Sequence, residues 1–140
     1  MTFVMSDYHG HREELSGPAD AGEWFDEQAD MVMPHGGSGQ VIWFGPASGP
    51  AELRVDVDVE AGRAALRWTV DGTYAVELEP GSPITVLESP DSGLVTVPAR
   101  LARVRPATAR AAVVEYVTTG RRPHHLTWVS EEDDPGATAM

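Results

Sequence analysis

The sequence predicts an α+β fold in which an antiparallel β-sheet of about five to seven strands packs against an N-terminal and a C-terminal helix. Two hydrophobic periods indicate this class. Residues 52–60 alternate strictly between charged and aliphatic side chains, which is typical of a strand with one face on the core and one in solvent. Residues 106–119 instead repeat apolar side chains at the period of a helix. At 140 residues without a long linker, we expect one domain over residues 1–140.

Residues 1 to about 40 are polar and irregular apart from one helix, which we expect over residues 18–31. Pro18 suits the first turn of a helix. Asp20 and Glu23 have the spacing of a capping box in which Asp20 is the cap. We expect residues 1–17 to be flexible, and also residues 131–140, which open with an acidic run.

The central residues carry the strand signals. Residues 64–70 and 74–78 alternate like residues 52–60, so the three segments predict an antiparallel meander. Asp71-Gly72 is a dipeptide favoured in a two-residue type I′ turn, which we expect between the second and third strands. Further strands are expected over residues 41–44, 84–87, 94–97 and, after the second helix, 126–129.

The second helix has a clear start and end in the sequence. Pro106 suits its first turn, and Gly120 lies where a left-handed residue usually ends a helix. Ala109, Val113 and Tyr116 fall on one face, so we expect them in the core.

Charge narrows the range of partners. The chain has 22 acidic residues and 10 basic residues, all arginine, for a net charge of −12. Nucleic acids and anionic membranes both require a cationic face, so we expect direct binding to neither. A basic partner is favoured instead, because opposite fields accelerate association. We find no signal-peptide pattern and no apolar run of membrane length, and therefore expect a cytoplasmic protein.

Motifs for catalysis are weak. The absence of cysteine excludes disulfides, thiolate zinc sites and thiol catalysis. The stretch around Ser38 resembles a nucleophile elbow only superficially, because Gln40 replaces the final glycine. Histidines occur as His9-x-His11 and as adjacent His124-His125, without a helical H-E-x-x-H pair. We therefore expect no enzyme, no catalytic residue, no metal site and no cofactor.

Acidic side chains are the candidates for partner binding. Asp56 and Asp58 lie two apart on the expected solvent face of one strand, about 7 Å from each other, and Glu60 extends this stripe. A second group lies on the polar face of the first predicted helix. The candidate partner-binding residues are Asp56, Asp58, Glu60, Asp26, Glu27 and Asp30. A solvated face without a partner explains any single one of them equally well.

The last third of the chain carries a recognisable pattern. The helix over residues 109–117 is followed by Thr118-Thr119-Gly120-Arg121-Arg122-Pro123 and then by Leu126-Thr127-Trp128. This ending resembles that of the deaminase-associated immunity family (Imm-one) of bacterial polymorphic toxin systems. In that family a helix closes on a threonine-glycine-x-x-proline turn, and a short strand with a tryptophan follows. The acidic first helix and the meander are compatible with this family.

The resemblance implies a stoichiometric inhibitor made in the toxin-producing cell and its kin. Its partner would be a cognate toxin, a zinc-dependent nucleic-acid deaminase domain. The entrance to the toxin's active site would be basic, because such enzymes bind a polyanion. An acidic protein can exclude the substrate by covering that entrance, without any catalysis. A standard interface of about 800 Å² per partner could supply nanomolar or better affinity.

Two other functions remain open at this stage. One is a small-ligand-binding or scaffold domain without catalytic activity, in which Trp24, Trp43 or Trp128 lines a pocket. The other is an enzyme that uses the histidines and carboxylates, with or without a metal ion.

Overall fold

The structure is a computed structural model that describes residues 2–31, 33, 37, 39–91 and 93–131. It confirms the α+β class, although the described residues form nine strands, more than the five to seven expected. In chain order the elements are β1 (Phe3–Ser6), β2 (Arg12–Leu15), α1 (Pro18–Ala29), β3 (Gln40–Pro46), β4 (Leu53–Asp58), β5 (Arg63–Trp68), β6 (Thr73–Val76), β7 (Ile84–Ser89), β8 (Gly93–Val97), α2 (Pro106–Thr119) and β9 (Thr127–Ser130).

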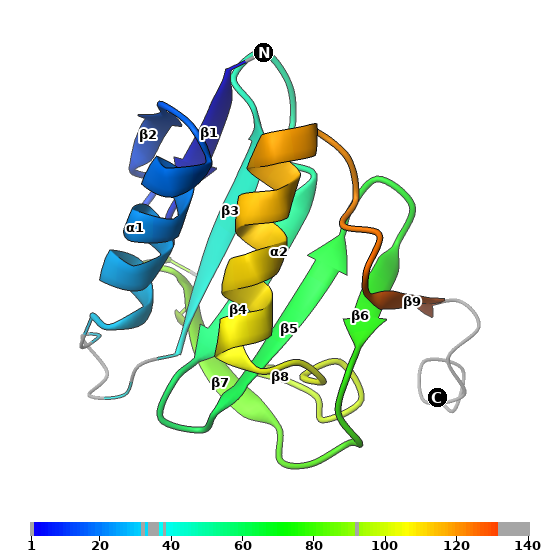
Figure 1. Cartoon of the computed structure of the whole chain (residues 1–140). Helices are drawn as coiled ribbons and strands as arrows, with labels where there is room; N and C mark the ends of the chain where they lie inside the picture. The colour runs from blue at the N-terminus through cyan, green and yellow to red at the C-terminus, as the bar shows by residue number, and fades with distance from the viewer. Residues whose placement is uncertain (1, 32, 34–36, 38, 92, 132–140) are drawn as a thin grey trace.

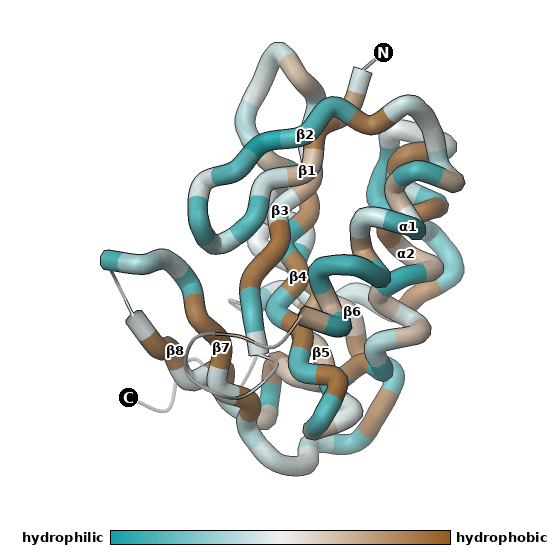
Figure 2. Tube along the Cα trace, turned by 90° about the vertical axis from the view of Figure 1, so that its left-hand side faces the viewer, coloured by the Kyte–Doolittle hydropathy of each residue, from teal (hydrophilic) through white to brown (hydrophobic). Residues whose placement is uncertain are grey.

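The molecule has three layers. The main sheet has the strand order β2-β1-β3-β4-β5-β6-β9, and the predicted antiparallel meander is its β4-β5-β6 part. Helices α1 and α2 lie side by side on one face of this sheet (Figure 1). The β7–β8 hairpin joins the sheet through one parallel pairing, Gln40 with Leu87, and lies on the opposite side from the helices (Figure 2).

The larger core lies between the helices and the sheet. Leu53, Val55 and Val57 of β4 are fully buried there, as their alternation predicted. At one end of this core Tyr116 of α2 packs edge-on against two aromatic rings, with ring centroids 5.1 Å from Phe3 and 5.5 Å from Trp68. Such aromatic contacts stabilise beyond the area that they bury.

Tyr116 also makes a partly buried polar contact. Its hydroxyl donates to Glu52 Oε1 at 2.6 Å, and burial together with this hydrogen bond raises the pKa of Tyr116 above its ordinary value. We expect Tyr116→Phe to lower the free energy of unfolding by about 1 kcal/mol, because a net hydrogen bond is lost while the ring packing stays. Urea denaturation would measure this, and Glu52→Gln, which keeps an acceptor, should have a smaller effect.

A second core lies under the hairpin. It is formed by side chains from the rear of the sheet, from the hairpin and from the segment before α2: Val41, Ala65, Tyr74, Ile84, Val86, Val97, Leu101 and Ala102. The rear face of the central strands is therefore partly covered. The alternation of residues 52–60 predicted the inner face of β4 correctly, but the expectation that its other face meets solvent is wrong.

The two helices differ in how well their sequences predicted them. Helix α2 has the expected bounds and ends at Gly120, whose φ of 73° is left-handed. Helix α1 ends two residues earlier than expected, and its N-cap is Gly17. Asp20 is therefore not the cap: it lies in the first turn, where its carboxylate accepts the backbone N–H of Ser16 at 2.9 Å. This bond is similar to that of a capping box, but it is made to the residue before the N-cap, and Gly17 has no side chain to make the reciprocal bond.

The β5–β6 connection is also different from the expected type I′ turn. It spans residues 69–72, and among the described residues only glycines have positive φ, so Asp71 cannot occupy the first position of such a turn. Thr69 extends the pairing of β5 with the segment just before β4. Its N–H donates to Glu52 O at 2.9 Å and its hydroxyl to Ala51 O at 2.8 Å.

The N-terminal residues are not irregular. Strand β1 lies inside the sheet between β2 and β3, and its Phe3, Val4 and Met5 are buried. Three apolar residues in a row are too short a signal to distinguish a buried strand from a loop. The other end, residues 131–140, was also expected to be flexible, and all of it except Glu131 lies outside the described residues.

Candidate partner-binding surface

Asp56 is not on the surface. Its side chain is fully buried on the rear face of β4, next to the hairpin. It lies between Arg54 of the same strand and Arg67 of β5. Arg54 Nη2 lies 3.0 Å from one carboxylate oxygen, and Arg67 Nη2 lies 3.1 Å from the other. The prediction that Asp56 belongs to an exposed stripe is wrong, because the hairpin and the arginines cover it.

Arg54 also connects the β7–β8 hairpin to the sheet. Arg54 also lies 3.0 Å from Glu88 of β7 and 5.6 Å above the ring of Trp43. Burial alone would lower the pKa of Arg54, but the charges and hydrogen bonds of Asp56 and Glu88 raise it above its ordinary value. This network holds two layers together, so we assign it a structural role.

Asp58 and Glu60 belong to the β4–β5 turn. The carboxylate of Asp58 accepts the N–H of Glu60 at 3.1 Å and that of Ala61 at 3.4 Å, which is the usual role of aspartate in a turn. Asp58 is half-buried, whereas Glu60 is exposed. Of the three carboxylates expected on this strand, only Glu60 is fully exposed.

Helix α1 presents an exposed acidic surface within the described part of the chain. Its sequence and C-cap hold five carboxylates and no basic residue, and Glu23, Asp26, Glu27 and Asp30 are exposed. Asp26 pairs with Arg110 of α2 at 2.8 Å. Glu23, Glu27 and Asp30 have no ion-pair or hydrogen-bond partner among the side chains that the structure describes. We define Glu23, Asp26, Glu27 and Asp30 as the α1 acidic face.

A tryptophan lies in the middle of these charges. Trp24 is half-buried and packs against the helix-side core. It lines a shallow hollow together with Asp20, Glu23, Asp26 and Glu27. A flat aromatic surface ringed by carboxylates suits a cationic side chain, because the ring and the charges attract it together.

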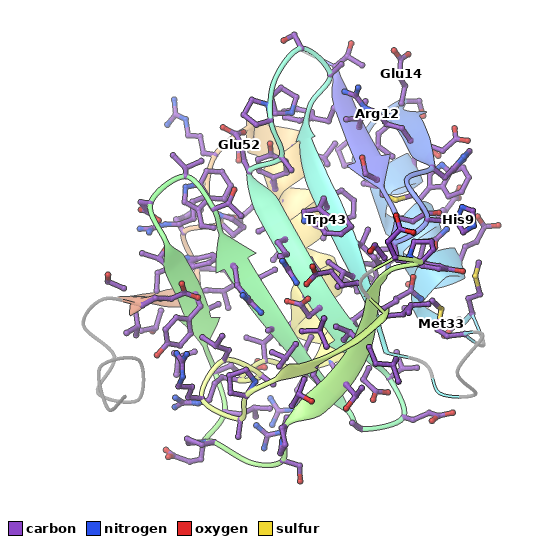
Figure 3. The ribbon with its side chains drawn as sticks, turned by 180° about the vertical axis from the view of Figure 1, so that it is seen from behind. His9, Arg12, Glu14, Met33, Trp43 and Glu52 are labelled. Atoms are coloured by element: carbon purple, nitrogen blue, oxygen red, sulfur yellow. The ribbon has the colours of Figure 1, made fainter. Side chains whose placement is uncertain are left out.

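A second hollow lies on the rear of the sheet. It is lined by Val4, Ser6, Arg12, Trp43, Gly45, Gly49 and Ala51. Figure 3 shows Trp43 on the part of this face that the hairpin leaves open, with Arg12 and Glu14 nearby on β2. The sequence indicated a core position for Trp43, but it is only half-buried. Arg12 is the one charged side chain among these lining residues, so the hollow offers less to a basic partner than α1 does.

The histidines form no metal centre within the described residues, where no group of three or more metal-ligating side chains comes together. His124 and His125 share one carboxylate instead. Glu115 Oε2 accepts the N–H of His124 at 2.9 Å, and Glu115 Oε1 lies 2.7 Å from Nδ1 of His125. His11 lies 2.6 Å from Glu13. Ser38, the centre of the weak nucleophile motif, lies outside the described residues.

Glu115 makes stability depend on pH. Burial would raise the pKa of Glu115, but the backbone hydrogen bond from His124 and the contact with His125 lower it below its ordinary value of 4.5. A lowered carboxyl pKa stabilises the fold above the ordinary pKa, and this contribution disappears as the pH falls through the lower, folded value. We expect Glu115→Gln to lower the free energy of unfolding by about 1 kcal/mol at neutral pH. Urea denaturation at several pH values should show this difference vanish in acid; a difference that persists there would contradict the assignment.

The C-terminal sequence pattern has a structural basis. Gly120 supplies the left-handed residue that ends α2, and its N–H donates to Tyr116 O at 2.7 Å. Trp128 then donates its ring N–H to Pro123 O at 2.7 Å, and Arg122 lies 5.2 Å above its ring. The glycine, the proline and the tryptophan thus form one folded unit that attaches β9 to the sheet.

The fold and these surfaces define a class: a small, acidic α+β domain with two helices on one face of an antiparallel sheet and an exposed acidic face on the first helix. The family model described as Immunity protein Imm1 matches residues 9–130. The chain belongs to this family, as its C-terminal pattern predicted, and membership implies an immunity protein with a cognate toxin as partner. No curated protein and no solved structure matches the chain. No helix in the described part of the chain could span a membrane.

Proposed function

We propose that this immunity protein neutralises a zinc-dependent nucleic-acid deaminase toxin by covering its basic substrate cleft with the α1 acidic face. The observation that carries the proposal is the set of carboxylates on one exposed helix, three of which lack a partner in the described structure. Unpaired exposed charges of one sign steer a partner of the opposite sign and can replace the phosphates that a nucleic acid would place there.

Exclusion of the substrate is sufficient for this function. A deaminase must take a base out of its stack and into a deep pocket, so a rigid protein across the pocket mouth stops the reaction. Helix α1, with 12 residues, is about 18 Å long, which is enough to span such an opening. Neither a catalytic residue nor a cofactor of the immunity protein takes part in this mechanism. The protein itself does not bind the nucleic acid, and we place the encounter in the cytoplasm.

The test is inhibition of the toxin encoded beside this gene. Its purified toxin domain would be mixed with the full chain, and deamination of single-stranded and double-stranded substrates would be followed. We expect complete loss of deamination at an equimolar ratio. Unchanged deamination by a toxin that forms no complex with the chain would refute the proposal, and a toxin without deaminase activity would restrict it to the general immunity role.

A further inference from the structure

The β7–β8 hairpin ends the rear layer with an open strand edge. Strand β8 pairs with β7 and with no other strand among the described residues, so the backbone groups on its outer side have no ladder partner there. Figure 2 shows β8 as the outermost strand on the side away from the helices. An open edge with unpaired N–H and C=O groups is a template for pairing with another strand.

The chemistry of β8 distinguishes it from the other two edges. Strand β2 has the sequence Arg12-Glu13-Glu14-Leu15, and β9 leads directly into the acidic run that starts at Glu131. Charges of this kind protect an edge, because a second strand of the same kind would be repelled. Strand β8 has the sequence Gly93-Leu94-Val95-Thr96-Val97, with no charge and no proline, and it is the longest of the three.

The side chains on the outer surface of β8 are also suited to contact. Leu94 is 53% exposed, one of three large apolar side chains that protrude among the described residues. Thr96 is exposed beside it and lies opposite the exposed Thr85 of β7. Val95 and Val97 point the other way and pack into the rear core. The strand thus offers one uncharged outer surface on a well-anchored support.

We propose that β8 pairs antiparallel with β8 of a second copy of this chain, forming a dimer in which the two hairpins join into one four-stranded sheet. A two-fold pairing centred on Val95 places Leu94 of each copy opposite Thr96 of the other and brings no like charges together, because β8 has no charged residue. The α1 acidic faces then lie on the far sides of the two protomers (Figure 2). Each copy keeps its acidic helix available, and the inference does not depend on the proposed function.

Charge sets the strength and the salt dependence of this dimer. Two chains of net charge −12 repel each other, and the contact of two short strands is much smaller than the standard interface of about 800 Å² per partner. We therefore expect a micromolar rather than a nanomolar association. Because salt screens the repulsion, raising the ionic strength from about 0.05 to 0.5 M should strengthen the dimer. Binding of a basic partner by α1 should respond to salt in the opposite direction.

The test is sedimentation of the full chain at concentrations up to about 1 mM, where an association this weak is still detected, at low and high salt. The variant Leu94→Lys with Thr96→Lys places charges on the outer surface of the edge strand. It should abolish the dimer, while circular dichroism and the melting temperature stay close to those of the parent, because both side chains are exposed. The matched control Thr85→Lys adds a charge to the same hairpin one strand away from the edge, and it should weaken the dimer much less.

Backbone substitutions give a second readout. Alternate residues of an edge strand direct their N–H inward and outward. Of Leu94→Pro and Val95→Pro, one should lower the stability of the hairpin and the other should leave the fold but remove the dimer. Hydrogen exchange of the β8 amides should slow at high protein concentration. The inference would be overturned if the chain stays monomeric at high salt. It would also be overturned if the variant with both lysines still forms a dimer while the β8 amides exchange without protection.

Discussion

Replacing Glu27 and Asp30 of α1 by lysine is expected to weaken toxin binding about 100-fold and to abolish inhibition at an equimolar ratio. Both carboxylates are exposed, and neither has a partner in the described structure, so their replacement should leave the fold intact. Each reversed charge would face a basic surface of the toxin, and a loss of about 1.4 kcal/mol per position gives the 100-fold change. Isothermal titration calorimetry and a deamination assay measure the two effects.

The matched control changes net charge by the same amount elsewhere. Glu14 on β2 and Glu79 after β6 are exposed, and replacing both by lysine also raises the net charge of the chain by four. This control should slow association slightly through the long-range field while leaving the dissociation rate unchanged. The salt dependence of binding should become weaker only in the α1 variant. If both variants lose affinity equally, net charge rather than the α1 acidic face governs binding.

Replacing Asp56 by asparagine is expected to lower the free energy of unfolding by about 3 kcal/mol. The carboxylate is fully buried and is the only acidic group paired with Arg67 among the described residues. Removing one member of a buried ion pair leaves an uncompensated charge, which typically destabilises by about 3–5 kcal/mol. The lower end applies here, because the arginine side chains keep 20% and 24% of their exposure and Glu88 still pairs with Arg54. Urea denaturation followed by circular dichroism measures the loss.

Asp58→Asn is the matched control on the same strand. Asp58 accepts backbone N–H groups of its own turn, and an asparagine oxygen can accept the same bonds, so this change should reduce stability by less than about 1 kcal/mol. An equal effect of the two substitutions would show that the arginine network around Asp56 contributes little. The Asp56 variant should still inhibit the toxin at temperatures where it is folded, because its carboxylate does not reach the surface.

Much of the fold could be predicted from local periodicity. Patterns within one element and its caps predicted the inner face of β4, the meander and both ends of α2. In these cases the identity of each residue alone indicates whether it is buried, exposed or at a helix end. The N-terminal strands could not be predicted in this way. Phe3-Val4-Met5 is a run of only three apolar residues, and its burial depends on pairing with β3, about 40 residues further along the chain.

The candidate site was predicted only in part, for a related reason. Alternation along β4 places Asp56 on the face opposite the core, but it contains no information on what covers that face. The cover is the β7–β8 hairpin, whose Glu88 lies 32 residues away in the sequence and completes the arginine network. On α1 the side chain of Arg110 pairs with Asp26 without burying it, and Asp26, Glu27 and Asp30 are exposed among the described residues, as the helical period predicted. Their role in partner binding stays a prediction.

The contact between Phe3 and Tyr116 has a consequence for synthesis of the protein. These rings lie 113 positions apart in the chain and meet at one end of the helix-side core. On the ribosome, the sheet surface under α2 therefore stays bare until almost the whole polypeptide has emerged from the exit tunnel. Long-range closure of this kind is slow relative to local helix formation. An immunity protein that must protect its host before the toxin acts would thus gain its protective shape only after translation is nearly complete.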